Sequence, residues 1–140
     1  MLRRALFALL ILFPFNAHAF LFGDDLPKGF MIKNIEGPGI QGTLTPAQFE
    51  ALFKKMGGKT SYKKGDNGAW VMVAEMKSRT EVARRQFGRE YTVELELTPG
   101  AFMDSLQVKG LTIAGEPQHG VDMATALRTW ENAILWEGIK

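Results

Sequence analysis

Two apolar runs in the middle of the chain constrain its fold more than any other feature. Residues 69–76, AWVMVAEM, are apolar at every position except Glu75, and residues 90–97, EYTVELEL, alternate strictly between polar and apolar. Alternation with a period of two is typical of a strand with one covered face, whereas a short continuous apolar run is typical of a strand covered on both faces. We therefore expect two antiparallel neighbours, with 69–76 as the central, covered strand.

Two helices are indicated by their first residues and by their apolar spacing. Thr45 is a good N-cap, and Pro46 at the first helical position lacks only an amide hydrogen that would have no partner there. Apolar residues then recur at helical spacing, which predicts a helix over about 45–56. From Met123 onward a second apolar stripe follows positions i, i+4, i+7 and i+11, which predicts a long amphipathic helix over about 121–138.

Shorter patterns predict the remaining elements. Short strands are expected at 30–35, 40–44, 60–64 and 111–114. The residues Gly65-Asp66-Asn67-Gly68 predict a hairpin turn. The connector 77–89 can hold a helical turn that starts at Thr80, and a short helix after Pro99 would turn Phe102, Met103 and Leu106 inward.

These elements together predict an α+β fold. We expect an antiparallel sheet of four or five strands, with the long C-terminal helix packed across one face. The segment 42–97, a helix followed by successive strands, resembles the small helix-plus-meander domains of envelope lipoproteins that assist outer-membrane assembly. The resemblance covers under half of the chain, and the lipid-anchor cysteine of those domains is missing because the chain has no cysteine.

The first nineteen residues have the order of a secretory signal peptide. Arg3 and Arg4 precede an apolar run over 5–15, which is shorter than the roughly 20 residues that span a bilayer. Ala17 and Ala19 then fit the small-residue rule for cleavage. The alternative is an uncleaved N-terminal anchor that continues through the apolar residues after Ala19.

Cleavage at this point defines the expected organisation and location of the protein. Residues 1–19 would be removed, 20–29 would form an N-terminal tail, and 30–140 would form a single α+β domain. An exported domain without cysteine has no disulfide and depends on packing for its stability. We expect it in the periplasm of a Gram-negative bacterium.

The net charge of the full chain differs from that of the chain expected after cleavage. The full chain carries 17 basic and 15 acidic residues, but Arg3 and Arg4 leave with the signal peptide, so the mature chain is formally neutral. A neutral chain without an aromatic–basic RNA-binding motif gives no support for a nucleic-acid partner.

Residues with catalytic or metal-binding chemistry are few. His119 is the only histidine after cleavage, and the chain has no cysteine, so a zinc site or a Ser-His-Asp triad finds little support. Glu94 and Glu96 share one face of a strand, where both meet the same solvent and gain no difference in pKa. We therefore expect no catalytic residue, no cofactor and no metal ion.

Basic and aromatic residues form the candidate interaction set. Lys63 and Lys64 would lie at the tip of the predicted hairpin, and a second basic group would lie at the opposite end of its central strand. That second group consists of Arg79, Arg84, Arg85 and Arg89. Arginine suits carboxylate or phosphate recognition, although solubilising charge is the simpler interpretation of both groups. Trp136, which is rotated off the apolar stripe of the last helix, completes the set as a candidate aromatic anchor.

The leading functional hypothesis is a non-catalytic periplasmic binding protein, an accessory of an envelope, secretion or conjugation assembly. Its partner would be an envelope protein, and the basic residues also leave open a peripheral contact with a membrane or with anionic lipid. The second hypothesis is a periplasmic immunity protein that inhibits a delivered toxin. The third is a small hydrolase that uses His119 or the glutamate face. The sequence does not separate the first two, and it leaves the oligomeric state open.

Overall fold

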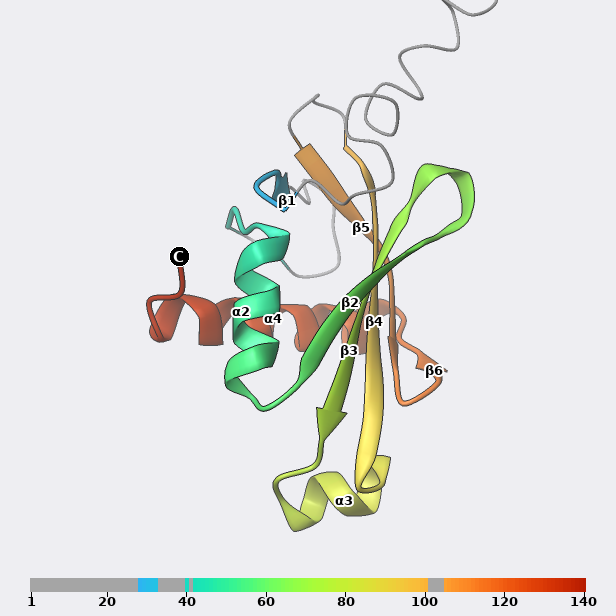
Figure 1. The fold of residues 1–140 in the computed structure, drawn as a ribbon, viewed down its shortest axis with the longest axis vertical. Coiled ribbons are helices and arrows are strands. Elements are labelled where there is room, and N and C mark those ends of the chain that lie inside the picture. The colour runs from blue at the N-terminus through green and yellow to red at the C-terminus, as the bar shows by residue number, and fades with distance from the viewer. Residues whose placement is uncertain (1–27, 33–39, 41, 101–104) are drawn as a thin grey trace, which may run out of the picture.

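The computed structural model describes residues 28–32, 40, 42–100 and 105–140. The predicted signal peptide, most of the predicted tail, and Phe102 and Met103 lie outside these residues. The described part has an α+β fold, as the sequence predicts (Figure 1).

Six strands of the described residues form one sheet in the order β1-β5-β4-β3-β2, with β6 paired to β5. The strands are β1 (Met31–Ile32), β2 (Lys59–Lys64), β3 (Trp70–Lys77), β4 (Glu90–Pro99), β5 (Ser105–Ile113) and β6 (Glu116–Pro117). β2 to β5 form an antiparallel meander, and β3 is a central strand. β1 pairs with β5 in parallel, so the predicted antiparallel sheet of four or five strands is extended by short strands at one side.

Two helices cover one face of the sheet. α2 (Pro46–Lys55) begins at Thr45, whose hydroxyl accepts a hydrogen bond from the Gln48 amide, while the Gln48 side chain accepts one from the Thr45 amide at 2.8 Å. This reciprocal capping box confirms the predicted start of the helix. α4 (Gly120–Trp136) crosses the strands of the sheet, and the predicted long C-terminal helix is thereby confirmed (Figure 1).

The hydrophobic core lies between these helices and the sheet. Its buried side chains include Trp70, Met72, Leu95, Leu97, Leu106, Val108 and Leu111 from the strands and Phe49, Phe53, Leu127 and Ile134 from the helices. One carboxylate, that of Glu131 on α4, is also buried and accepts a hydrogen bond from the Gly42 amide at 2.8 Å. The core therefore joins residues from both halves of the described chain.

The expectation that β3 is covered on both faces was wrong. Within β3, Val71 and Val73 alternate with the core residues. They point to the face opposite α2 and α4, where Glu75 is exposed. Val71 is nevertheless buried, because Lys63 on β2 and Glu96 on β4 lie directly across from it on the same face. Neighbouring side chains, rather than a second layer of helices, account for its burial.

The region after Pro99 also differs from the prediction. Leu106 belongs to the extended strand β5 and not to a short helix, and β5 replaces the short strand predicted at 111–114. The β4–β5 pairing shifts register between Glu96 and Leu97, so Val108 and Leu111 both face the core although they are three residues apart. This bulge interrupts the period-two pattern and hides the strand from sequence analysis.

The predicted N-terminal strands are described only in part. Within the predicted strand 30–35 the structure assigns only Met31–Ile32, and residues 33–35 lie outside the described part. Of the predicted strand 40–44, Leu44 forms an isolated bridge with Ile32, whose amide donates to the Leu44 carbonyl at 2.6 Å.

The predicted turn at 65–68 is confirmed as a single 3₁₀ turn over Asp66–Gly68.

Candidate interaction site

The arginine-bearing connector 78–89 projects from the end of the sheet where β3 stops and β4 begins (Figure 1). Ser78 closes its base: the Ser78 amide donates to the Arg89 carbonyl at 2.9 Å, and the Ser78 hydroxyl donates to the Gly88 carbonyl at 2.5 Å. Within the connector, α3 (Glu81–Phe87) begins at Thr80, as the sequence predicts. We call this end of the molecule, with the connector and the residues beside it, the α3 end.

The helix α3 has little contact with the rest of the protein. None of its residues is buried, and Val82 is 73% exposed. Its ring contact is between Phe87 and Tyr91 on β4, whose centroids lie 4.9 Å apart. The base of the connector and one aromatic contact therefore hold α3 against the sheet.

The connector gathers four exposed arginines, Arg79, Arg84, Arg85 and Arg89. Arg85 is paired with Glu81, one helical turn earlier, at 2.8 Å. Within the described residues the other three make no ion pair. The structure thus brings together four of the seven residues of the predicted interaction set, and three of these four have no ion-pair partner within the described part of the chain.

Arg79 reaches from the connector to the turn between α2 and β2. A β-carbon placed on Gly57 would lie 2.6 Å from its Nη2 atom, and Gly57 itself has a φ of +86°. The positive φ favours glycine at this position, and the mobile guanidinium of Arg79 occupies the space beside it. The arginine therefore lies at the rim of the groove that Gly57 helps to line.

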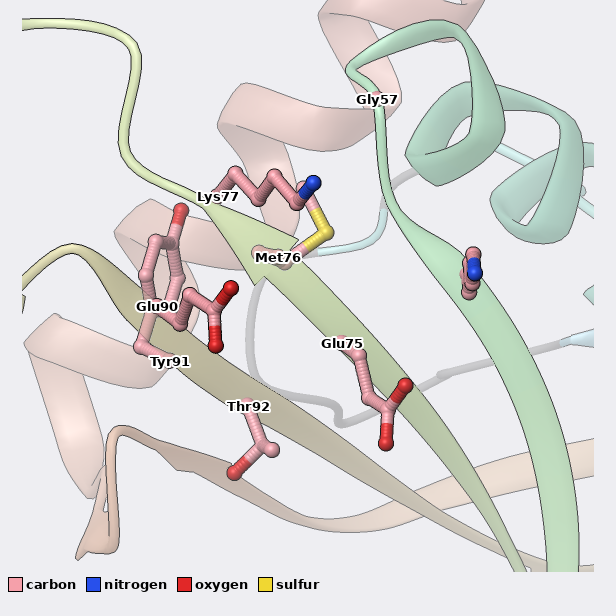
Figure 2. Close-up of a pocket in the computed structure, with 8 residues that line it drawn as sticks. Gly57, Glu75, Met76, Lys77, Glu90, Tyr91 and Thr92 are labelled. Atoms are coloured by element: carbon pink, nitrogen blue, oxygen red, sulfur yellow. The ribbon is translucent and has the colours of Figure 1, made fainter.

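A groove of about 470 Å³ lies beside the connector, at the ends of β2, β3 and β4 (Figure 2). Its lining residues are Gly57, Lys59, Glu75, Met76, Lys77, Glu90, Tyr91 and Thr92. Lys59 lies opposite Glu75, and Lys77 lies opposite Glu90, in the strand register. Because opposite charges face each other across the strands, the groove itself is balanced and the excess charge of this end belongs to the arginines.

An apolar cavity of about 150 Å³ adjoins the groove and shares Met76 and Tyr91 with it. Its walls come from both helices that cover the sheet, from α3 and from three strands. They consist of Phe53, Met56, Met76, Phe87, Tyr91, Val93, Ile113 and Trp130. Several of these side chains are only half-buried, so the cavity reaches the surface under α3.

Tyr91 lines both the groove and the cavity, and its hydroxyl is a hydrogen-bond donor. Burial raises the pKa of Tyr91 above its ordinary value, so the hydroxyl keeps its proton at neutral pH. Tyr91 lies opposite Met76 in the strand register, on the core face of the sheet, whereas Lys77 and Glu90 pair on the other face. A ligand with an acceptor group can therefore use this donor.

The other predicted interaction residues lie elsewhere. Lys63 and Lys64 are at the far end of β3, at the tip of the β2–β3 hairpin. Lys63 is paired with Glu94 at 2.7 Å, and the Lys64 ammonium lies 5.6 Å from the centroid of the Trp70 ring. Trp136 is 91% exposed at the end of α4 and lines neither the groove nor the cavity. The predicted set is thus divided among three places.

Residues with possible catalytic chemistry lie apart from the α3 end. His119 is exposed at the start of α4, and its side chain makes no capping hydrogen bond. Glu94 and Glu96 share the face of the sheet opposite the helices, as the sequence predicts. In the part of the chain that the structure describes, no group of three histidine, aspartate or glutamate side chains is arranged to hold a metal ion. No helix of that part is long and apolar enough to cross a membrane.

The sequence did not reveal the apolar cavity. Tyr91 belongs to the alternating run 90–97 and Trp130 to the apolar stripe of the last helix, but their meeting with Phe87 and Ile113 depends on elements that are distant in the chain. Phe87, the single aromatic residue of the connector, was the one signal available. An isolated apolar residue of this kind indicates that part of a loop packs back on the domain.

Comparison of the chain with protein-family models, with curated proteins and with solved structures found no significant match. The resemblance of 42–97 to helix-plus-meander envelope domains therefore carries no argument about function. The functional interpretation rests on the geometry of the α3 end.

Proposed function

We propose that this protein is an exported, non-catalytic binding protein, an accessory of an envelope, secretion or conjugation assembly in the periplasm, and that the α3 end is its contact surface. The observation that carries the proposal is that Arg79, Arg84 and Arg89, which make no ion pair in the described part of the chain, lie on the same connector as Phe87, which forms one wall of an apolar cavity. A desolvated apolar centre with a polar rim is the usual anatomy of a protein–protein interface.

The arrangement of the arginines favours recognition over simple solubility. Solubilising surface charge usually mixes both signs, so that no single-sign patch forms. Lys63 follows that pattern, since it is paired with Glu94. The arginines of the connector do not, because only Arg85 has a carboxylate partner in the described residues. Arginine is also the side chain best suited to bidentate contact with carboxylate or phosphate.

The proposal is tested by site-specific photo-crosslinking in cells that export the protein. A photoreactive residue at Val82, which is 73% exposed on α3, is compared with one at Lys109, which is exposed on β5. We expect one adduct of defined mass from position 82 and none from position 109. Mass spectrometry should identify the adduct as the same envelope protein in repeated experiments.

A charge reversal completes the test. Changing Arg79, Arg84 and Arg89 together to glutamate should remove the adduct from position 82, whereas Lys109→Glu should leave it unchanged. A diffuse set of adducts from both positions, or an adduct that survives the triple reversal, would show that the α3 end is not the contact surface.

A further inference from the structure

We infer that the α3 end binds a segment of a partner protein in which one aromatic side chain is flanked by carboxylates. The aromatic ring would enter the apolar cavity beneath α3, and the carboxylates would pair with Arg79, Arg84 and Arg89. This inference rests on the proposed function and specifies the chemistry of the partner.

The volume of the cavity selects a single side chain as the occupant. At about 150 Å³ it is smaller than the roughly 300–1,000 Å³ of pockets that enclose whole small molecules. Apolar cavities of about 150 Å³ in other proteins bind benzene. A phenyl ring therefore matches the space, whereas the acyl chain of a lipid needs a longer channel.

The walls of the cavity favour an aromatic occupant. Phe53 and Trp130 meet edge to face, with ring centroids 5.2 Å apart, and Phe87 lies against Tyr91 on another wall. Aromatic rings stabilise one another in edge-to-face and offset arrangements by about 0.5–1.5 kcal/mol beyond the burial of their area. The sulfur of Met76 is suited to contact with an aromatic ring as well.

The charges around the cavity select carboxylates beside the ring. The lysines and glutamates of the groove are balanced across the strands, so the arginines determine the sign of the potential. Tyr91, which lines the cavity, adds a protonated hydroxyl as a hydrogen-bond donor. Since all of these groups donate hydrogen bonds, the adjoining groups of the partner are acceptors with negative charge.

Movement of α3 widens the opening through which the ring enters the cavity. Phe87 forms the wall on the α3 side, and no residue of α3 is buried. Segments with few buried contacts open at low free-energy cost. A small displacement of α3 therefore opens the cavity without disturbing the core of α2, α4 and the sheet.

The test uses a fluorescein-labelled heptapeptide with the sequence Glu-Asp-Glu-Phe-Glu-Asp-Glu and measures its fluorescence anisotropy with the mature protein. Two control peptides replace the phenylalanine by serine, or the acidic residues by glutamine. We expect each control to bind at least about tenfold more weakly, because a buried anchor and a group of charge contacts each contribute more than about 1.4 kcal/mol at interfaces of this kind.

Variants of the protein assign the two contributions. Ile113→Phe should fill the cavity, so that the phenylalanine and serine peptides bind with the same affinity. Phe87→Ala removes one wall of the cavity. Because no residue of α3 is buried, this variant should fold even if Ile113→Phe does not, and it should weaken the binding of the phenylalanine peptide. Arg84→Glu should weaken the binding of the phenylalanine peptide, with its acidic residues intact, several-fold more than Lys109→Glu does.

Equal binding of the phenylalanine and serine peptides would overturn the inference. So would binding to phosphatidylglycerol vesicles without binding to the peptide, since that result assigns the arginines to a membrane surface. If the crosslinked partner is lost with the triple arginine reversal but kept with both Ile113→Phe and Phe87→Ala, the inference fails and the proposed function stands. Peptide binding without any adduct in cells would instead contradict the proposed function.

Discussion

At the scale of single residues, one polar cluster ties the N-terminal described residues to α2 and β2. The carboxylate of Glu50 lies 3.2 Å from the Lys28 ammonium and accepts a hydrogen bond of 2.5 Å from the Tyr62 hydroxyl. The Lys28 ammonium also lies 4.9 Å from the centroid of the Tyr62 ring. The cluster therefore joins three segments that the sequence does not relate to one another.

The cluster alters the acidity of both partners. Burial opposes the ionisation of Glu50, but the hydrogen bond from Tyr62 and the interaction with Lys28 outweigh it, so the pKa of Glu50 lies below its ordinary value. Burial, together with the Glu50 carboxylate, raises the pKa of Tyr62 well above its usual range. Tyr62 is thus a permanent donor, and ionised Glu50 stabilises the fold.

We predict that Glu50→Gln lowers the free energy of unfolding by about 1 kcal/mol at pH 7, a modest value because the Glu50 side chain is 31% exposed. The pKa of Glu50 is lower in the folded protein than in the unfolded protein. Its contribution to stability is therefore complete above the unfolded pKa, about 4.3, and is lost as the pH falls through the folded pKa. Urea unfolding at pH 7 and pH 3 should show that the difference between wild type and variant closes in acid. Glu81→Gln, at an exposed ion pair, is the control and should change little. A difference that grows in acid would contradict the assignment.

Gly58 is a second residue with a testable structural role. A β-carbon there would lie 2.4 Å from the Met76 sulfur, 3.0 Å from the Phe53 carbonyl oxygen and 3.2 Å from the Glu75 carbonyl oxygen. The sulfur can move, but the two backbone oxygens cannot move without displacing α2 from β3. We predict that Gly58→Ala lowers the free energy of unfolding by about 1–3 kcal/mol, the usual cost of overpacking. Gly29→Ala, which meets no atom within 4 Å, is the matched control in the same denaturation experiment, and equal effects would argue against close packing at Gly58.

At the scale of elements, α2 and α3 have similar threonine caps but different attachments. Thr45 caps α2, which buries Phe49 and Phe53 in the core, whereas Thr80 caps α3, which buries none of its residues. A cap stabilises the whole protein only where its helix unfolds together with the core.

We predict that Thr45→Ala lowers the free energy of global unfolding by about 1 kcal/mol, the usual cost of losing an N-cap. Thr80→Ala should leave global unfolding nearly unchanged and should instead increase the amide hydrogen exchange of α3. Chemical denaturation and hydrogen-exchange mass spectrometry of both variants measure the two effects. Equal loss of global stability in the two variants would show that α3 is part of the core, and it would remove the access path proposed for the cavity.

The elements also show why some of the fold was predictable and some was not. α2, α3 and the turn at Asp66–Gly68 were predicted because caps and turn residues act within a few residues of one another. β5 was not predicted at its full length, because the bulge opposite Glu96 and Leu97 changes which residues face the core. The pairing of β1 with β5 in parallel joins residues more than seventy positions apart, and no local pattern records it.

At the scale of the whole molecule, the predicted export signal has consequences for the mass and the charge of the mature protein. We predict that the protein recovered from a periplasmic fraction begins at Phe20 and carries a formal net charge of zero. Intact-mass and N-terminal peptide measurements test both statements, and Ala19→Leu at the cleavage site should retain the precursor in the membrane fraction. A recovered chain that still begins at residue 1 would favour the uncleaved anchor.

The sequence by itself determined the α+β class, the two covering helices, the central strand and the spacing of the four connector arginines. Caps, periodicity and proximity along the chain are local properties, so the order of residues is sufficient to specify them. The tertiary structure alone decided that the connector carrying these arginines closes one side of an apolar cavity through Phe87, while Lys63, Lys64 and Trp136 lie elsewhere. The cavity depends on contacts between residues as distant as Phe53 and Trp130, which the core brings together when α4 packs across the sheet.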